Sequence, residues 1–178
     1  EDMPLVAAPG RARRADIAKS VGCRVDKTWA LLSFTTLDWD DTALSRIEKL
    51  RDVEFFTIKP LEWRRRNVHP IDRDMFSYSD VLASCDVVVS KPGFGVVSEC
   101  VVNRKPIIYA DRTDFVEYDV LVAGIQRYLR SVHLPAESLY RGELAEALAA
   151  ICAQPEPKET LPGDGAEVVA RRLASFLD

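Results

Sequence analysis

The sequence lacks the long hydrophobic run of a membrane protein: no uninterrupted apolar stretch among its 178 residues approaches the roughly 18–20 that a membrane-spanning helix needs. No secretory signal peptide is visible at its start. Its four cysteines are far apart and form no C-x-x-C pair, and with only two histidines they make neither a zinc-binding pattern nor a disulfide framework. Cys85 and Cys100 fall in apolar stretches and are expected in the core. Free thiols suit the reducing cytoplasm, which is the location we expect.

A large excess of one charge is also lacking. The chain has 24 lysines and arginines against 28 aspartates and glutamates, for a net charge of −4. This balance gives no reason to expect nucleic-acid binding, which needs a basic surface. Two arginine clusters, within residues 11–14 and 64–66, are expected on solvated faces or loops. With 47% hydrophobic residues, the length fits one globular domain with a sizeable core.

No internal repeat or low-complexity tract is present. Residues 1–27, which contain Pro4, Pro9 and Gly10, are expected to form a linker that leads into a single domain at 28–178. Apolar runs in that domain predict strands at Thr28–Phe34, Val53–Ile58, Val68–Ile71, Asp86–Ser90, Pro106–Ala110 and Tyr128–Val132. Helical spacing predicts helices at Thr42–Leu50, Ser77–Cys85, Gly93–Asn103, Tyr118–Gln126, Glu143–Cys152 and Ala166–Leu177.

This alternation of strands and helices predicts a parallel, doubly wound sheet with helices on both faces, a three-layer Rossmann-like α/β fold. Ligands of such sheets bind beyond the carboxyl ends of the strands, near the point where the strand order reverses. The turns after Phe34, Ser90 and Ala110 are therefore the expected place for a functional site.

Neither the P-loop pattern G-x-x-x-x-G-K-[ST] nor the dinucleotide pattern G-x-G-x-x-G is present. The segment 86–99 nevertheless runs from a buried strand through Gly93 and Gly95 into a helix. Glycines allow positive φ and close approach of an anion, and a helix N-terminus offers unpaired N–H groups to phosphate oxygens. Lys91 adds a positive charge at the rim. From the residues alone, a phosphate site and a plain βα turn explain this segment equally well.

The segment DVVVSKPGFGVVSE, followed by CVVNRKPIIYADRTDFVEYDVLVA, resembles the C-terminal, donor-binding half of GT-B glycosyltransferases. It is most similar to the family of the peptidoglycan N-acetylglucosaminyltransferase and to the glycosyltransferase-like module of arabinokinases. In that family a buried strand, a small-residue turn, a helix with a glutamate, a second strand and a polar loop follow one another. The match runs in this order from about Ser77 to Ala123, and the rest of the chain fits more loosely.

The resemblance implies that the chain binds a nucleotide sugar, expected to be a UDP-sugar, as a substrate and not as a cofactor. The N-terminal half, with the acceptor site and commonly the catalytic base, is absent from this chain, so the isolated domain is expected to be inactive. The donor diphosphate is expected at Lys91, Gly93, Phe94, Gly95 and Val96.

The resemblance places the ribose at Glu99. A carboxylate suits this role because its two oxygens can accept two O–H donors at once, although a glutamate near a helix N-terminus is also favoured by the helix dipole alone. The sugar hydroxyls are expected at Asp114, Glu117 and Asp119, each of which is also a possible helix cap. Met75 and Phe76 occupy the stretch whose backbone contacts the base.

The sequence departs from the family pattern in three places. The first βα turn, 33–37, has no glycine where the family is glycine-rich. Tyr118 takes the first place of the polar residue pair that contacts the sugar hydroxyls in this family, so the identity of the sugar is not predicted. Asp38-Trp39-Asp40 spells the metal-binding D-x-D of another glycosyltransferase fold. Because a helix follows directly, we expect an aspartate cap and no metal.

No catalytic base is predicted, and His69 and His133 are expected to be structural. Two alternatives remain besides donor binding for glycosyl transfer. One is a UDP-sugar epimerase of the same architecture. The other is a non-catalytic nucleotide-sugar-binding or regulatory module, which the glycine-free first turn favours. The acceptor, the stereochemical outcome and the oligomeric state are not predicted.

Overall fold

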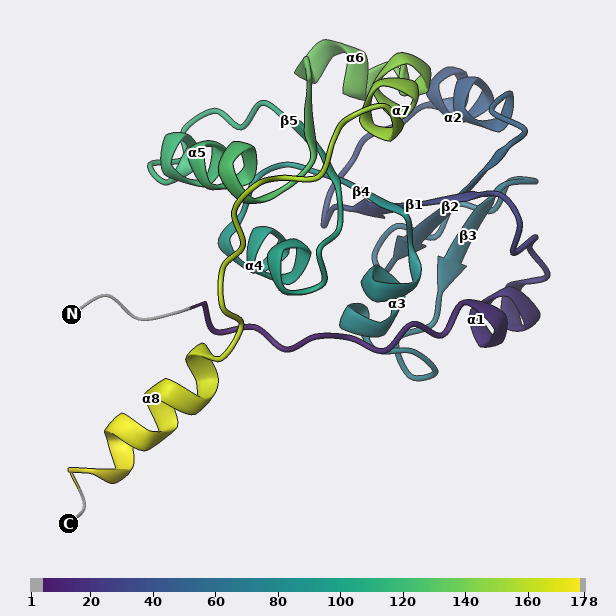
Figure 1. The fold of residues 1–178 in the computed structure, drawn as a ribbon. Helices are drawn as coiled ribbons and strands as arrows, with labels where there is room; N and C mark the ends of the chain where they lie inside the picture. Colours follow the sequence, from purple (N-terminus) through teal and green to yellow (C-terminus); the bar gives the residue numbers. More distant parts are fainter. Residues whose placement is uncertain (1–4, 177–178) are drawn as a thin grey trace.

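The computed structural model describes residues 5–176 (Figure 1). Residues 1–4 of the predicted linker, and the predicted helix end at Leu177, lie outside this range. The strands are β1 (Thr28–Ser33), β2 (Val53–Ile58), β3 (Val68–Ile71), β4 (Val87–Ser90), β5 (Ile107–Ala110) and β6 (Ser131–Leu134). The helices are α1 (Arg14–Val21), α2 (Asp41–Glu48), α3 (Tyr78–Ser84), α4 (Phe94–Val102), α5 (Tyr118–Tyr128), α6 (Ala136–Tyr140), α7 (Ala145–Cys152) and α8 (Gly165–Ala174).

The six strands form one sheet in the order β3-β2-β1-β4-β5-β6, and all neighbours are parallel. β1, β2, β4 and β5 are buried along most of their length, as expected for strands covered on both faces. The order reverses between β1 and β4, where Ser33 lies opposite Ser90. This is the predicted doubly wound Rossmann-like fold, and its switch point lies at two of the three predicted turns, those after Phe34 and Ser90.

Helices cover both faces of the sheet and bury a core on each. Figure 1 shows α2, α6 and α7 on one side and α1, α3 and α4 on the other. The first core includes Ile47, Leu139 and Leu148 from α2, α6 and α7. The second includes Ile17, Leu82, Cys100 and Ile125 from α1, α3, α4 and α5, together with Cys85. The two cores make the three predicted layers and confirm that Cys85 and Cys100 are core residues.

Side-chain caps fix two helix starts where they were predicted. The Asp40 carboxylate accepts from the Ala43 N–H at 2.8 Å, and the Ser77 hydroxyl accepts from the Asp80 N–H at 3.1 Å. An aspartate or serine in this place satisfies an N–H group that the helix itself leaves unpaired. Asp40 of the D-x-D triplet therefore works as a helix cap.

The end of α5 and the position of β6 differ from prediction. The helix runs to Tyr128, two residues beyond the predicted end, and the strand is Ser131–Leu134 instead of Tyr128–Val132. An apolar run of this length fits a helix end as well as a strand start, so periodicity does not separate them. The shift places His133 inside β6, opposite Tyr109 of β5. The short helix α6 was not predicted, because five residues are too few to show a period.

The N-terminal segment packs more closely than expected. α1 buries Ile17 completely. The Arg14 guanidinium lies 4.4 Å from the centre of the Trp29 ring, and its NH1 donates to both Asp86 carboxylate oxygens at 2.9 and 3.0 Å. Arg14 is therefore a packing residue and not part of a solvated face. The boundary between 1–27 and 28–178 stays a prediction.

Gly10 marks the place where this segment crosses the outside of α3. A Cβ atom at Gly10 would lie 1.9 Å from the Ser79 carbonyl oxygen, closer than any side chain tolerates. The Gly10 N–H donates to Asn103 Oδ1 at the end of α4, and the Arg11 N–H donates to Asp80 of α3. The segment thus lies across α3 and α4 and covers the space between them (Figure 1).

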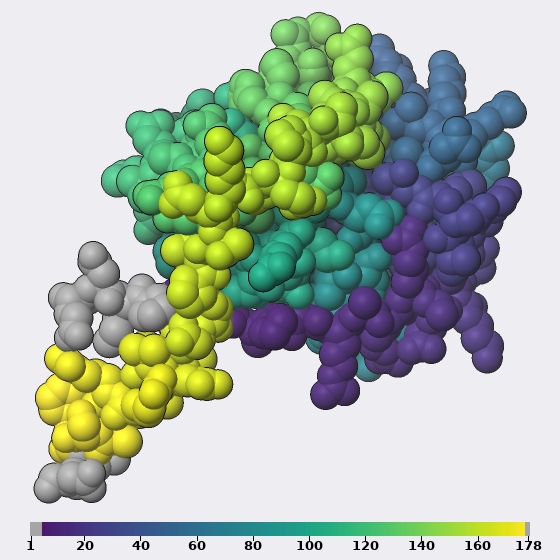
Figure 2. All heavy atoms as spheres, viewed as in Figure 1, coloured from purple at the N-terminus to yellow at the C-terminus, as the bar shows by residue number. Residues whose placement is uncertain are grey.

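The C-terminal helix α8 projects away from the rest of the molecule (Figures 1 and 2). Figure 2 shows the chain before α8 lying along the surface of the domain. In α8 only Gly165 is buried, and Leu173 and Phe176 near the end are 62% and 75% exposed. Among residues 5–176, no helix combines the length and the apolar character that crossing a membrane requires.

Candidate functional site

The carboxyl ends of β1 and β4 meet at the switch point, where three hydroxyl groups form a network. Ser90 Oγ donates to the Ser33 carbonyl oxygen at 2.8 Å, and the hydroxyls of Ser33 and Tyr78 hydrogen-bond at 2.8 Å. Burial raises the pKa of Tyr78, so its hydroxyl stays protonated. The Ser33 hydroxyl at the glycine-free first turn thus holds the start of α3 at the carboxyl end of the sheet.

The predicted phosphate turn connects β4 to α4. Gly93 is the N-cap of α4 and no side chain caps this helix, so its first N–H groups have no intrahelical acceptor. The turn does not use the positive φ that its glycines allow: Gly93 has a φ of −151°, and Gly95 lies within the helix. A Cβ atom at Gly93 would lie 3.3 Å from Arg112 NH1, the end of a flexible side chain that a small shift can accommodate.

Arg112 is a residue that sequence reasoning missed. It follows β5, and its NH1 donates to the Pro92 carbonyl oxygen at 2.9 Å, while its guanidinium stacks 3.5 Å from the centre of the Phe115 ring. On the other flank, Lys91 Nζ donates to the Tyr140 hydroxyl at 2.7 Å. Two cations therefore flank the uncapped N-terminus of α4. Only the pairing of β4 with β5 brings Arg112 to this turn, and sequence distance hides it.

Glu99 lies in the second turn of α4 and faces α3. Its Oε1 accepts from Ser79 Oγ at 3.0 Å. Its Oε2 is buried and has no hydrogen-bond partner among the described residues. Leaving a buried polar atom unpaired costs about 1–3 kcal/mol, and more for a charged group, so such an atom calls for an explanation.

Met75 and Phe76 precede α3 at the same edge. Both of their N–H groups donate to the Asp72 carbonyl oxygen, at 3.2 and 3.1 Å, and so are engaged within their own turn. The Phe76 side chain is buried, with the Arg13 guanidinium 4.9 Å from its ring centre, while Met75 is exposed. The structure thus places Glu99 and Met75 on the α3 side of the phosphate turn.

The three predicted sugar contacts lie beyond β5 on an exposed stretch. Asp114 has a φ of 56°, Glu117 precedes α5, and Asp119 lies in its first turn. All three are exposed, and none forms a side-chain hydrogen bond or ion pair within the described chain. Their role stays a prediction.

His133 lies at this edge as well, and not in a buried structural position. Its Nε2 is 2.7 Å from Asp111 Oδ1, and its side chain is 45% exposed. Asp111 is the first residue after β5, and its Oδ2 accepts from the Ala136 N–H at 3.1 Å. The hydrogen bond from His133 holds the pKa of Asp111 below its usual range, so the carboxylate is ionised at neutral pH.

His69, in contrast, is mostly covered, with its side chain 11% exposed. Its Nε2 is 2.8 Å from Glu54 Oε2, and Lys27 Nζ is 2.8 Å from Glu54 Oε1. Burial acts to raise the pKa of Glu54, but the hydrogen bonds from Lys27 and His69 outweigh it and lower the pKa. This network is structural, as predicted for His69.

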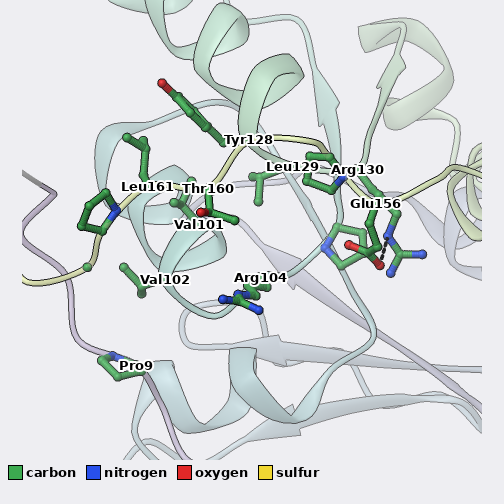
Figure 3. A pocket seen from close by; sticks show the side chains of 14 residues that line it. Pro9, Val101, Val102, Arg104, Tyr128, Leu129, Arg130, Glu156, Thr160 and Leu161 are labelled. Atoms are coloured by element: carbon green, nitrogen blue, oxygen red, sulfur yellow. Dashed lines mark ion pairs between the residues drawn. The ribbon is translucent and has the colours of Figure 1, made fainter.

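A cavity of about 810 Å³ lies at the other edge of the sheet. Figure 3 shows Arg104, Arg130 and Glu156 around it, with apolar side chains of α4 and of the C-terminal segment. Arg104 and Arg130 lie before β5 and β6, at the amino ends of these strands, so this cavity is separate from the phosphate turn. Within residues 5–176, no group of three His, Cys, Asp or Glu side chains is placed to hold a metal ion.

No protein-family profile and no curated protein matches the sequence. Solved structures do match. A kitacinnamycin glycosyltransferase is 16% identical with a TM-score of 0.53, covering 84% of this chain and 38% of its own. The glycosyltransferase VinC in complex with dTDP is 14% identical with a TM-score of 0.56, covering 72% and 34%. The spinosyn rhamnosyltransferase SpnG, solved with the spinosyn aglycone, is 14% identical with a TM-score of 0.51, covering 98% and 46%.

The chain has the fold of one half of a GT-B glycosyltransferase. It spans between a third and a half of the length of these structures, covering 34–46% of their chains. Identities of this size support the shared fold alone.

Proposed function

We propose that this chain is the donor half of a glycosyltransferase and that it binds a nucleotide sugar, with a UDP-sugar as the donor. The observation that carries the proposal is the buried, unpaired Oε2 of Glu99. It lies on the helix that follows the phosphate turn, beside the start of α3. A ribose brings two adjacent hydroxyls, and turning the Glu99 side chain from Ser79 to the edge lets both carboxylate oxygens accept from them.

The phosphate turn supports the same proposal. Diphosphate oxygens are well served by the uncapped N–H groups at Phe94, Gly95 and Val96 and by the positive end of the α4 dipole. Lys91 and Arg112 add two charges at the flanks. In glycosyl transfer the nucleoside diphosphate leaves with the electron pair of the broken bond. Donors fixed around its oxygens stabilise that developing charge.

The proposal also includes the type of GT-B protein, the second half of the active site, the base contacts and the location of the protein. Among GT-B proteins, we keep the peptidoglycan N-acetylglucosaminyltransferase and arabinokinase-module type as the best match to segment 86–123. An N-terminal half with the acceptor site completes the active site. Met75 and Phe76 contact the base through their backbone carbonyl groups, because their N–H groups donate to Asp72. We keep a cytoplasmic location, in accord with four cysteines that are all free thiols.

Isothermal titration of the chain with UDP, UDP-glucose and UDP-N-acetylglucosamine tests the proposal. We expect weak binding that Glu99→Gln reduces by about ten-fold or more, since a hydrogen bond to a charged group is worth roughly 1.5–3 kcal/mol. Glu167→Gln is the matched control, because Glu167 is exposed on α8, which projects away from the rest of the molecule. A folded wild type that binds no nucleotide sugar overturns the proposal.

One observation favours a non-catalytic module instead. The Ser33 hydroxyl, which the glycine-free turn offers to a ligand, is occupied by Tyr78. A turn held in this way binds a donor but has less freedom to line a catalytic cleft. Assays of the longer protein decide: donor binding without transfer or hydrolysis of the sugar supports the module.

A further inference from the structure

The second histidine of the chain forms a braced pair that the predicted site did not include. The Asp111 carboxylate holds His133 at 2.7 Å through Nε2 and is itself held by the Ala136 N–H at 3.1 Å. The Tyr118 hydroxyl adds a contact to Oδ1 at 3.4 Å. Because an ionised carboxylate only accepts, the proton lies on Nε2 and the tautomer is fixed.

This leaves Nδ1 as the available atom of His133. It has no hydrogen-bond partner among the described residues, and the side chain is 45% exposed. The Tyr109 ring limits the motion of the imidazole, with ring centres 5.5 Å apart, and the Tyr109 hydroxyl is tied to Gln126 at 3.1 Å. The His133 imidazole is held by Asp111 and Tyr109, so its Nδ1 is positioned to form a hydrogen bond with a hydroxyl group of a ligand.

The position of the Asp111–His133 pair relative to the phosphate turn indicates which part of a bound donor it faces. α3 lies on one side of α4 and α5 on the other (Figure 1). Glu99 contacts α3, so a nucleoside bound there extends to the α3 side of Gly93. The group beyond the diphosphate then extends to the opposite side, over the ends of β5 and β6. Asp111 and His133 lie at that position.

We propose that His133 Nδ1 contacts a hydroxyl of the transferred sugar, with Asp111 as its positioning residue. This inference rests on the proposed donor site and adds the side chain that distinguishes a nucleotide sugar from the bare nucleotide. Neutral His133 with its proton on Nε2 accepts from the sugar hydroxyl at Nδ1, and the protonated ring donates to the hydroxyl oxygen.

Two histidines make the test direct, because the imidazole signals in NMR spectra consist of His133 and the interior His69 as an internal control. The chain is titrated with UDP and with a panel of UDP-glucose, UDP-N-acetylglucosamine and dTDP-glucose. We expect the His133 signals to move with at least one sugar nucleotide but not with UDP, while the His69 signals stay in place.

The other possible outcomes separate a failure of this inference from a failure of the proposed function. Backbone shifts at residues 93–96 without a shift of His133 overturn this inference and leave the proposed function intact. Equal His133 shifts with UDP and with the sugar nucleotides place the contact on the diphosphate and overturn the sugar assignment. No shift with any compound overturns both proposals.

Variants provide a second measurement. His133→Gln keeps a polar side chain but loses the braced ring, and we expect a roughly 3- to 10-fold loss of affinity for the sugar nucleotide with no change for UDP. Asp111→Asn is expected to produce part of this loss and to move the His133 Nδ1 and Nε2 resonances in the free protein. Equal losses for UDP and for the sugar nucleotide contradict the proposal.

Discussion

Ser79 Oγ donates to Glu99 Oε1 at 3.0 Å and joins the first turn of α3 to the second turn of α4, while Glu99 Oε2 stays buried and unpaired. The two residues have separable roles. Ser79→Ala is expected to lower the free energy of unfolding by about 1–3 kcal/mol, because it leaves a second carboxylate oxygen without a donor. Donor affinity should be retained, since the ribose supplies its own hydroxyls. Urea unfolding and isothermal titration measure the two effects, and a large loss of affinity in Ser79→Ala contradicts this division.

Arg112 is expected to provide charge for the diphosphate. Arg112→Ala should reduce the affinity for UDP by about ten-fold or more while leaving that for uridine unchanged. It should also reduce the dependence of UDP affinity on salt. Arg112→Lys is expected to restore binding only in part, because an ammonium lacks the planar face that stacks on Phe115.

Arg104→Ala is the matched control for Arg112, because Arg104 is an exposed arginine beside the cavity at the opposite edge (Figure 3). Equal effects of the two substitutions on UDP affinity would show that Arg112 acts through general charge alone.

Two glycines should respond to alanine in opposite ways. Gly10→Ala places a Cβ atom 1.9 Å from the Ser79 carbonyl oxygen, and overpacking of this kind costs about 1–3 kcal/mol. Gly124 lies within α5 with nothing within 4 Å of an added Cβ, so Gly124→Ala should stabilise the protein by up to about 1 kcal/mol. Thermal unfolding tests both. A destabilised Gly124→Ala, or an unaffected Gly10→Ala, contradicts the packing described for these segments.

Acid should destabilise the fold through Glu54. Its pKa is lowered in the folded state from an ordinary value of 4.5, so its contribution to stability is present above that value. The contribution is lost as the pH falls through the lower folded value. Glu54→Gln should remove this part of the acid dependence. At neutral pH it should cost about 3–5 kcal/mol, because Lys27 and His69 lose their buried carboxylate. Urea unfolding measured between about pH 3 and pH 7 tests this prediction. If Glu54→Gln loses as much stability at low pH as the wild type, the assignment is contradicted.

Local signals in the sequence predicted much of the fold. The bounds of β2 and β3, the aspartate cap of α2, and the strand–turn–helix at 86–102 depend on neighbouring residues, and the structure confirms them. α1 was missed because the arginines at 11, 13 and 14 were assigned to a solvated face or loop, and because its packing depends on Trp29 and Asp86, far along the chain. Gly93 and Gly95 allow positive φ, but neither adopts it, because the residue type permits this conformation without requiring it.

The candidate site shows the same limit. Arg112 reaches Pro92, and His133 reaches Asp111, across pairs of neighbouring strands and over 20 and 22 residues of sequence. Neither pair leaves a periodic or motif signal. His133 was further obscured because the predicted last strand ended one residue before it. Contacts between different strand ends follow from sheet order, which the sequence predicts only as a class of fold.

The central claim is that a nucleotide sugar binds at the switch point, with its ribose at Glu99. Intermolecular NOEs between UDP-glucose and the isotope-labelled chain test this most directly. We predict NOEs from the ribose protons to the side chains of Ser79 and Glu99 and from the glucose protons to His133. Ribose NOEs to residues around Arg104 and Arg130 at the other edge of the sheet (Figure 3), or none to α3 and α4, would contradict the account.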